Sequence, residues 1–155
     1  MAKFVWTDQL NIGIDVIDQQ HRRIVEYINQ LDDARDSGHT QEEIAAVLGQ
    51  LVDYTLSHFA FEESMQEEAN YPFSKAHKKV HDLFTQRVAE YQTRFNKGED
   101  ITKALSSMLV TWLFNHIKRD DADYAAAIKA HLEKQNGSAL MEKKKSLFSK
   151  LFSKT

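Results

Sequence analysis

Apolar residues recur at steps of three and four along most of this chain, and that spacing marks one face of an α-helix. The spacing holds over four long stretches, near residues 18–36, 41–66, 72–95 and 102–120. A shorter stretch, residues 124–132, continues the fourth after an interruption or bend near Asp120. Near the N-terminus apolar residues alternate instead, at Ile12, Ile14 and Val16. We therefore predict helices over the long stretches and an extended arm over residues 1–17.

Residues that favour helix ends stand at the boundaries of these stretches. Asp18 is a candidate N-cap of the first helix. Thr40, followed three residues later by Glu43, is a capping-box pattern that opens the second. Pro72 suits the first position of the third helix, and Thr102 is a candidate cap of the fourth.

Four helices of similar length with short connections predict an all-α fold, an up-down-up-down antiparallel four-helix bundle. The five Gly and single Pro agree with this, because they leave few breaks for turns. We assign residues 1–136 to one bundle domain, with residues 1–17 as its N-terminal arm. Gly137 and Ser138 then separate a tail, residues 137–155.

Composition excludes several classes of protein. The chain has no Cys, so it has neither disulfides nor thiolate metal sites. The N-terminus lacks the apolar run of a signal peptide, and we find no stretch of about 20 apolar residues to span a membrane. We expect a cytoplasmic protein.

Charge divides the chain in two. Residues 142–155 carry five Lys and one Glu, and subtracting their +4 from the total of −3 leaves −7 for residues 1–141. So acidic a body has no footprint for nucleic acid. In the tail, apolar residues repeat at four-residue steps among the lysines: Leu147, Phe148, Leu151 and Phe152. Residues 143–154 thus form a basic amphipathic helix that could bind a protein partner or an anionic membrane. In the second case the protein would be peripheral at the inner face of the membrane. The alternatives are a solvated tail and packing on its own bundle.

Histidines and carboxylates fall on the predicted inner faces of all four helices. The candidate ligands are His21, His58, Glu62, His77, His81, His116 and either Asp120 or Asp121. Two pairs, His58 with Glu62 and His77 with His81, are four residues apart and share a helix face. About seven N and O donors exceed the needs of one tetrahedral zinc and suit two metal ions. On a straight helix Asp120 would share the face of His116, whereas Asp121 would be rotated by ~140°.

Other metal templates fit poorly. The chain has no His-Glu-x-x-His, the motif of zinc proteases. Ferritin-like di-iron proteins use Glu-x-x-His with more carboxylates, whereas here imidazole dominates and the steps are four. A ligand set of this kind suits two divalent ions of borderline softness, such as iron.

The full pattern resembles the hemerythrin family, in particular its single-domain bacterial members. The matching residues span about 4–130 and read Asp18-x-Gln20-His21, His58-Phe59-x-x-Glu62, His77-x-x-x-His81 and Trp112-Leu113-x-x-His116-Ile117-x-x-x-Asp121-x-x-Tyr124. The family pattern selects Asp121 over Asp120, which requires the last helix to bend or end there.

This resemblance implies a non-haem di-iron centre that binds O2 reversibly. His77, His81 and His116 would hold one iron ion, and His21 and His58 the other, which has the open position. Glu62 and Asp121 would bridge both ions beside a bridging hydroxide or oxo group. The side chains that could wall off an O2 pocket are Ile24, Phe59, Trp112, Leu113 and Ile117.

The leading functional prediction is therefore an O2 carrier, storage or delivery protein, a monomer and not an enzyme. A second is an O2- or redox-sensing adaptor that acts through the tail. A di-iron oxidase, peroxidase or nitric-oxide-handling protein is a third, disfavoured by the His-rich ligand set and by the lack of a further acid or base.

Overall fold

The computed structural model describes residues 4–134, 143 and 145–150. Its elements, in chain order, are a 3-10 turn η1 (Asp8–Leu10), α1 (Asp15–Asp36), α2 (Gln41–Glu68), α3 (Ser74–Asn96), α4 (Thr102–His116), a π-helical segment η2 (Ile117–Asp121) and α5 (Ala122–Lys134). Residues 145–150 form a further helical piece of the tail.

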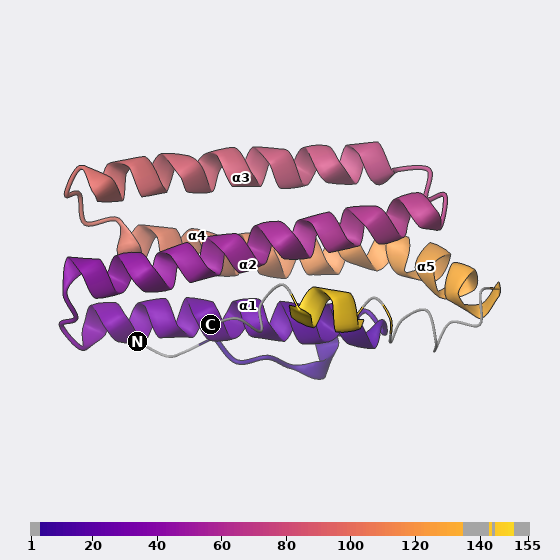
Figure 1. Cartoon of the computed structure of the whole chain (residues 1–155), viewed down its shortest axis with the longest axis horizontal. Helices are drawn as coiled ribbons and strands as arrows, with labels where there is room; N and C mark the ends of the chain where they lie inside the picture. Colours follow the sequence, from indigo (N-terminus) through magenta and orange to yellow (C-terminus); the bar gives the residue numbers. More distant parts are fainter. Residues whose placement is uncertain (1–3, 135–142, 144, 151–155) are drawn as a thin grey trace.

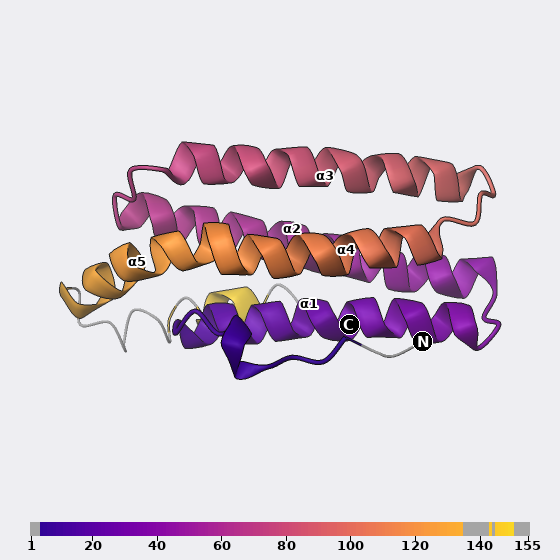
Figure 2. The same ribbon diagram turned by 180° about the vertical axis from the view of Figure 1, so that it is seen from behind.

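Figures 1 and 2 show α1 to α4 as four long, roughly parallel rods, with α5 continuing the line of α4 beyond η2. Successive rods run in opposite directions. Contacts join α1 to α2 and α4, α2 to α3, and α3 to α4, so the four close into a ring. The predicted all-α antiparallel four-helix bundle is confirmed.

Local sequence signals account for several helix ends. At the start of α2, Thr40 accepts a hydrogen bond from the amide of Glu43 while the Glu43 carboxylate accepts one from the amide of Thr40, so the predicted capping box is present. Gly38 after α1 and Gly98 after α3 have φ values of 70° and 90°. This left-handed conformation follows helix C-termini and costs glycine least.

Three predicted helix starts were wrong by a few residues. The first helix begins at Asp15, and Asp18 lies inside it and caps no helix N–H. Its carboxylate points back to the arm and accepts bonds from the amides of Ile12 at 2.8 Å and Gly13 at 3.1 Å. Pro72 lies before the third helix, which begins at Ser74. Thr102 is the first residue of the fourth helix, and Ile101 is at the N-cap position. The hydroxyl of Thr102 donates a hydrogen bond to Asp100.

The N-terminal arm lies along α1. Phe4 exchanges two hydrogen bonds with the Asn29 side chain, at 3.1 and 3.0 Å, and the arm buries Leu10, Ile12 and Ile14. The 3-10 turn η1 interrupts the extended course of the arm. Through these contacts the arm covers α1, the helix that carries His21.

The predicted bend near Asp120 is the π-helical segment η2, where one extra residue enters the turn between α4 and α5.

Among the described residues, α2 is long and apolar enough to span a membrane by length and composition, contrary to our expectation. Core helices meet the same criteria, and α2 packs between α1 and α3 with His58 and Glu62 buried.

Candidate metal centre

Seven polar side chains meet in the middle of the bundle, where apolar residues would be expected. Each helix of the ring contributes, and all seven are between 0 and 5% exposed: His21 from α1, His58 and Glu62 from α2, His77 and His81 from α3, His116 from α4 and Asp121 from η2. Burial of ionisable groups costs free energy unless they are paired or coordinated. The structure therefore brings together all seven predicted ligands.

The two oxygens of Glu62 face different histidines. Oε1 lies 3.2 Å from Nε2 of His77 and 3.4 Å from Nε2 of His81. Oε2 lies 2.8 Å from Nε2 of His58 and 3.4 Å from Nε2 of His21. A single carboxylate thus stands between two groups of imidazoles.

Asp121 repeats this division. Its Oδ1 lies 3.1 Å from Nε2 of both His77 and His116, whereas Oδ2 lies 3.1 Å from Nε2 of His21. The cluster therefore has a three-histidine side and a two-histidine side, with one oxygen of each carboxylate directed to each side. Because a carboxylate has two donor oxygens and an imidazole ligates through one nitrogen, this is the donor arrangement for two metal ions.

Unsatisfied polar atoms support a metal at this site. Among the described residues, neither ring nitrogen of His21, neither oxygen of Asp121 and not Oε2 of Glu62 has a hydrogen-bond partner. Buried polar atoms rarely lack partners unless a water or an ion satisfies them. Nε2 of His81 and Nε2 of His116 also approach to 3.0 Å, as two ligands of one ion would. The residues present fit a pair of metal cations.

The outer nitrogens of three histidines have acceptors of their own. Nδ1 of His58 donates to Gln20 at 2.6 Å. Nδ1 of His81 donates to Glu63 at 3.3 Å, and Nδ1 of His116 to Asp120 at 2.8 Å. Such contacts fix the ring and its tautomer and leave Nε2 free to ligate.

Sequence reasoning assigned no role to Gln20, Glu63 or Asp120 as acceptors. A signal existed for Asp120, four residues after His116, and for Gln20, which is part of the family pattern. Glu63 had none, because its contact reaches across to another helix.

The η2 segment explains how both aspartates serve one imidazole. In a regular α-helix, residues four and five after His116 would point in different directions. The wider π turn lets Asp120 reach Nδ1 at 2.8 Å and Asp121 reach Nε2 at 3.1 Å. Asp121 is fully buried within the cluster, whereas Asp120 is part-exposed at its edge. Asp121, which the family pattern selected, is thus the aspartate inside the cluster, and its role as bridging ligand stays a prediction.

The carboxylates also change how the imidazoles titrate. Burial lowers the pKa of His21, but the close carboxylates of Asp121 and Glu62 outweigh it and raise that pKa to about 9. The same carboxylates raise the pKa of His77 and of His116 to about 9 against the effect of burial. Metal ligation requires neutral imidazole, so a metal must displace these protons.

Burial acts differently on the other groups. It dominates at His58, whose pKa is lowered. Burial alone would raise the pKa of Glu62 and Asp121, but the facing imidazoles hold both pKa values below the ordinary range for a carboxyl. Both carboxylates are therefore charged and ready to ligate at neutral pH.

Aromatic rings enclose the three-histidine side. Phe59 stacks on His81 with 3.8 Å between ring centroids, and Trp112 stacks on His116 at 4.3 Å. Four of the five predicted pocket residues are buried: Ile24, Phe59, Leu113 and Ile117. Trp112 is part-exposed at the surface between α3 and α4. These side chains exclude bulk solvent from the imidazoles.

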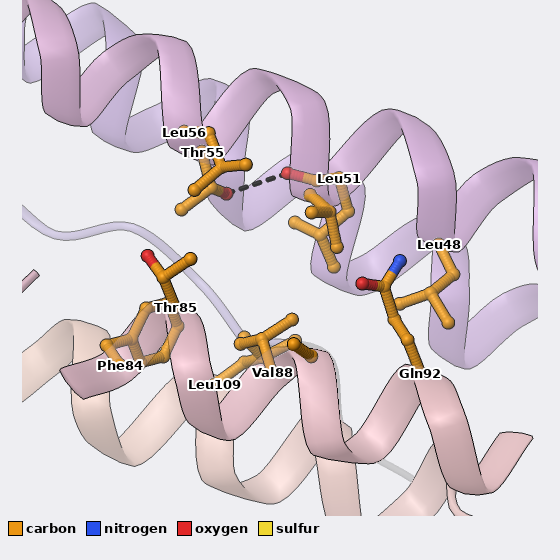
Figure 3. Close-up of a pocket in the computed structure, with 11 residues that line it drawn as sticks. Leu48, Leu51, Thr55, Leu56, Phe84, Thr85, Val88, Gln92 and Leu109 are labelled. Atoms are coloured by element: carbon orange, nitrogen blue, oxygen red, sulfur yellow. Dashed lines mark hydrogen bonds between the residues drawn. The ribbon is translucent and has the colours of Figure 1, made fainter. Parts of the chain in front are cut away.

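An apolar pocket of about 160 Å³ opens between α2, α3 and α4, one helical turn from the cluster (Figure 3). Thr55, Phe84 and Leu109 are among its lining residues. The hydroxyl of Thr55 donates to the carbonyl of Leu51 at 2.7 Å, and that of Thr85 to the carbonyl of His81 at 2.9 Å. Both hydroxyls donate within their own helices, and apart from these and Gln92 the lining is apolar.

Four helices around five histidines and two carboxylates define a metal-binding helical bundle, of the kind that holds two ions. A family model, the Hemerythrin HHE cation binding domain, matches residues 12–128 of the chain. The chain belongs to the hemerythrin family, which binds non-haem di-iron, and its buried cluster fits such a site.

Individual relatives agree with this assignment. A bacteriohemerythrin of Stenotrophomonas maltophilia is 58% identical over 132 residues, which cover 85% of this chain and 86% of that protein. A bacteriohemerythrin of Methylococcus capsulatus is 31% identical over 84% of this chain and all of its own length. The crystal structure of a wild-type hemerythrin superposes with a TM-score of 0.77 at 29% identity, covering 82% of this chain and 98% of that one. These similarities make the chain a di-iron protein that binds or senses oxygen.

Proposed function

We propose that this protein binds O2 reversibly at the di-iron centre, as a carrier or store, rather than catalysing a reaction. The observation that carries the proposal is the unequal division of the cluster. Three imidazoles and two carboxylate oxygens face one side, but only two imidazoles and two carboxylate oxygens face the other. With one further bridging ligand, the first side reaches six donors, whereas the second has five and can accept a small ligand.

Each residue has a role in this proposal. His77, His81 and His116 would hold one ion, His21 and His58 would hold the other, and Glu62 and Asp121 would lie between the two. The iron pair would supply the two electrons that O2 takes up on binding. Gln20, Glu63 and Asp120 hold three of the imidazoles in ligating orientation. O2 is apolar, and the pocket beside Phe84 gives it a place to enter from which water is disfavoured.

The test is an optical titration of iron-loaded, anaerobically reduced protein with O2, followed by argon. We expect an absorption band that appears with O2 and fades under argon over repeated cycles. His58→Ala should lose this response, because it removes one of the two imidazoles on the open side. His39→Ala is the matched control, since His39 lies exposed in the loop after α1. Immediate oxidation with no reversible band would instead favour an oxidase or a sensor.

Oxygen or redox sensing is the second candidate, and one contact supports it. Phe61, next to Glu62 on α2, packs against Phe148 of the tail with ring centroids 5.5 Å apart. A shift of Glu62 could therefore reach the tail through a single helix. Hydrogen exchange of residues 145–150, compared between the reduced and O2-treated protein, tests this: equal exchange would exclude signalling by this route.

A further inference from the structure

In the described part of the tail, an aromatic side chain packs against the bundle. The ring of Phe148 makes edge contacts with Tyr54 at 5.5 Å and 90° and with Phe61 at 5.5 Å and 77°. Tyr54 in turn packs on Tyr27 of α1 at 5.5 Å. We call Tyr27, Tyr54 and Phe61 the aromatic patch. Figures 1 and 2 show the tail helix in yellow beside α1 and α2 at this place.

The contact covers only part of the apolar face of the tail. Leu147, beside Phe148, is 55% exposed, and Lys143 and Lys150 are also exposed. In the sequence, the same four-residue spacing continues to Leu151 and Phe152, which lie outside the described residues. The docked segment thus still presents one leucine and has two exposed lysines among its described residues.

We propose that this segment is a membrane-surface anchor, which the aromatic patch holds on the bundle until an anionic lipid surface takes it. Residues 143–155 contain only Lys, Ser, Leu, Phe and Thr. A lipid surface requires an apolar face and positive charge, which this segment has, rather than a shape-specific set of contacts. Residues 142–155 carry +4 and residues 1–141 carry −7, so the body itself favours the docked state while anionic lipid competes for the same lysines.

The proposal is independent of O2 binding and is tested on the full chain with vesicles. We expect the protein to sediment with vesicles of phosphatidylglycerol and phosphatidylcholine, and not with phosphatidylcholine alone. Changing Lys143, Lys145 and Lys150 together to Gln should weaken binding at least tenfold. Equal binding to both vesicles, or none to either, would overturn the proposal, as would binding to polyglutamate alone, which would indicate an acidic protein partner.

A matched pair of variants separates the tail from general surface hydrophobicity. Leu147→Glu should abolish sedimentation, because it places a charge on the inserting face without disturbing a buried contact. Leu83→Glu makes the same change at an exposed leucine on α3, 57% exposed, and should bind as the unaltered protein does. Equal behaviour of the two variants would contradict an anchor in the tail.

A third variant tests the role of the aromatic patch. Phe61→Ala removes one of the two rings that hold Phe148, so the tail should be released more easily and bind phosphatidylglycerol vesicles several-fold more tightly. Circular dichroism and iron content would verify that the bundle is intact. Unchanged or weaker binding by an intact variant would show that the patch does not compete with lipid.

Discussion

Consecutive aspartates at the end of the bundle have different tasks because the backbone between them and His116 is π-helical. Asp121 is inside the cluster and faces two groups of imidazoles, whereas Asp120 touches only the outer nitrogen of His116. We expect Asp121 to bridge two metal ions and Asp120 to hold the imidazole of His116 in its orientation.

We predict that Asp121→Ala loses most of its bound iron. Asp120→Ala should keep the site but bind iron about 10- to 100-fold more weakly, the usual cost of removing an acceptor behind a ligating histidine. Iron per chain and competition with a chelator measure the two effects. Loss of iron in Asp120→Ala alone would show that Asp120 is the ligand.

Residue spacing was sufficient to predict six members of the cluster, because helical geometry puts i and i+4 on one face and charged groups seldom occupy an apolar stripe. The seventh, Asp121, was selected by the family pattern. Spacing was not sufficient for Glu63, since the contact with His81 depends on how α2 and α3 pack. Between Asp120 and Asp121, regular helical geometry gave the wrong preference. The reason is physical: an extra residue in the turn shifts which side chain faces inward, and spacing alone does not reveal such a turn.

At the scale of elements, the junction between the arm and α1 depends on one carboxylate. Asp18 accepts hydrogen bonds from the amides of Ile12 and Gly13 and so ties the arm to the helix that carries His21. From the sequence we predicted that Asp18 is an N-cap. The prediction was wrong because an aspartate near a helix start can accept hydrogen bonds from amides that precede it as well as from those that follow it. The path of the arm decides which amides are within reach.

Asp18→Ala should lower the free energy of unfolding of the metal-free protein by about 2 kcal/mol, because it leaves the buried amide of Ile12 and the part-buried amide of Gly13 without this acceptor. Asp18→Asn keeps one acceptor oxygen and should lose less. Thr40→Ala, which removes a helix cap of ordinary strength, should cost about 1 kcal/mol and gives the scale. Urea unfolding measures all three. An Asp18→Ala protein as stable as the parent would mean that solvent replaces these bonds.

At the scale of the whole molecule, the cluster links all four helices of the ring through buried charges. Without metal, the charges are balanced by protons on His21, His77 and His116, whose pKa values are raised to about 9 from the ordinary 6.5 of histidine. A group whose pKa is raised on folding stabilises the fold fully below its unfolded pKa, and this contribution disappears as pH rises to the folded pKa.

The metal-free protein should therefore lose thermal stability progressively between about pH 6.5 and 9, a window set by these three histidines. Iron-loaded protein should lack this decline, since its imidazoles are neutral and ligated throughout. Differential scanning calorimetry across this range compares the two forms. A metal-free Tm that stays flat or rises would contradict the protonated cluster.

The order of the ligands along the chain also has a consequence for how the cell makes this protein. Asp121 is synthesised a hundred residues after His21, and it completes both sides of the cluster. While translation proceeds, the growing chain offers histidines and Glu62 but only half of the bridging oxygens. A site for two ions is therefore complete only after Asp121 has been synthesised and its helix has packed into the bundle.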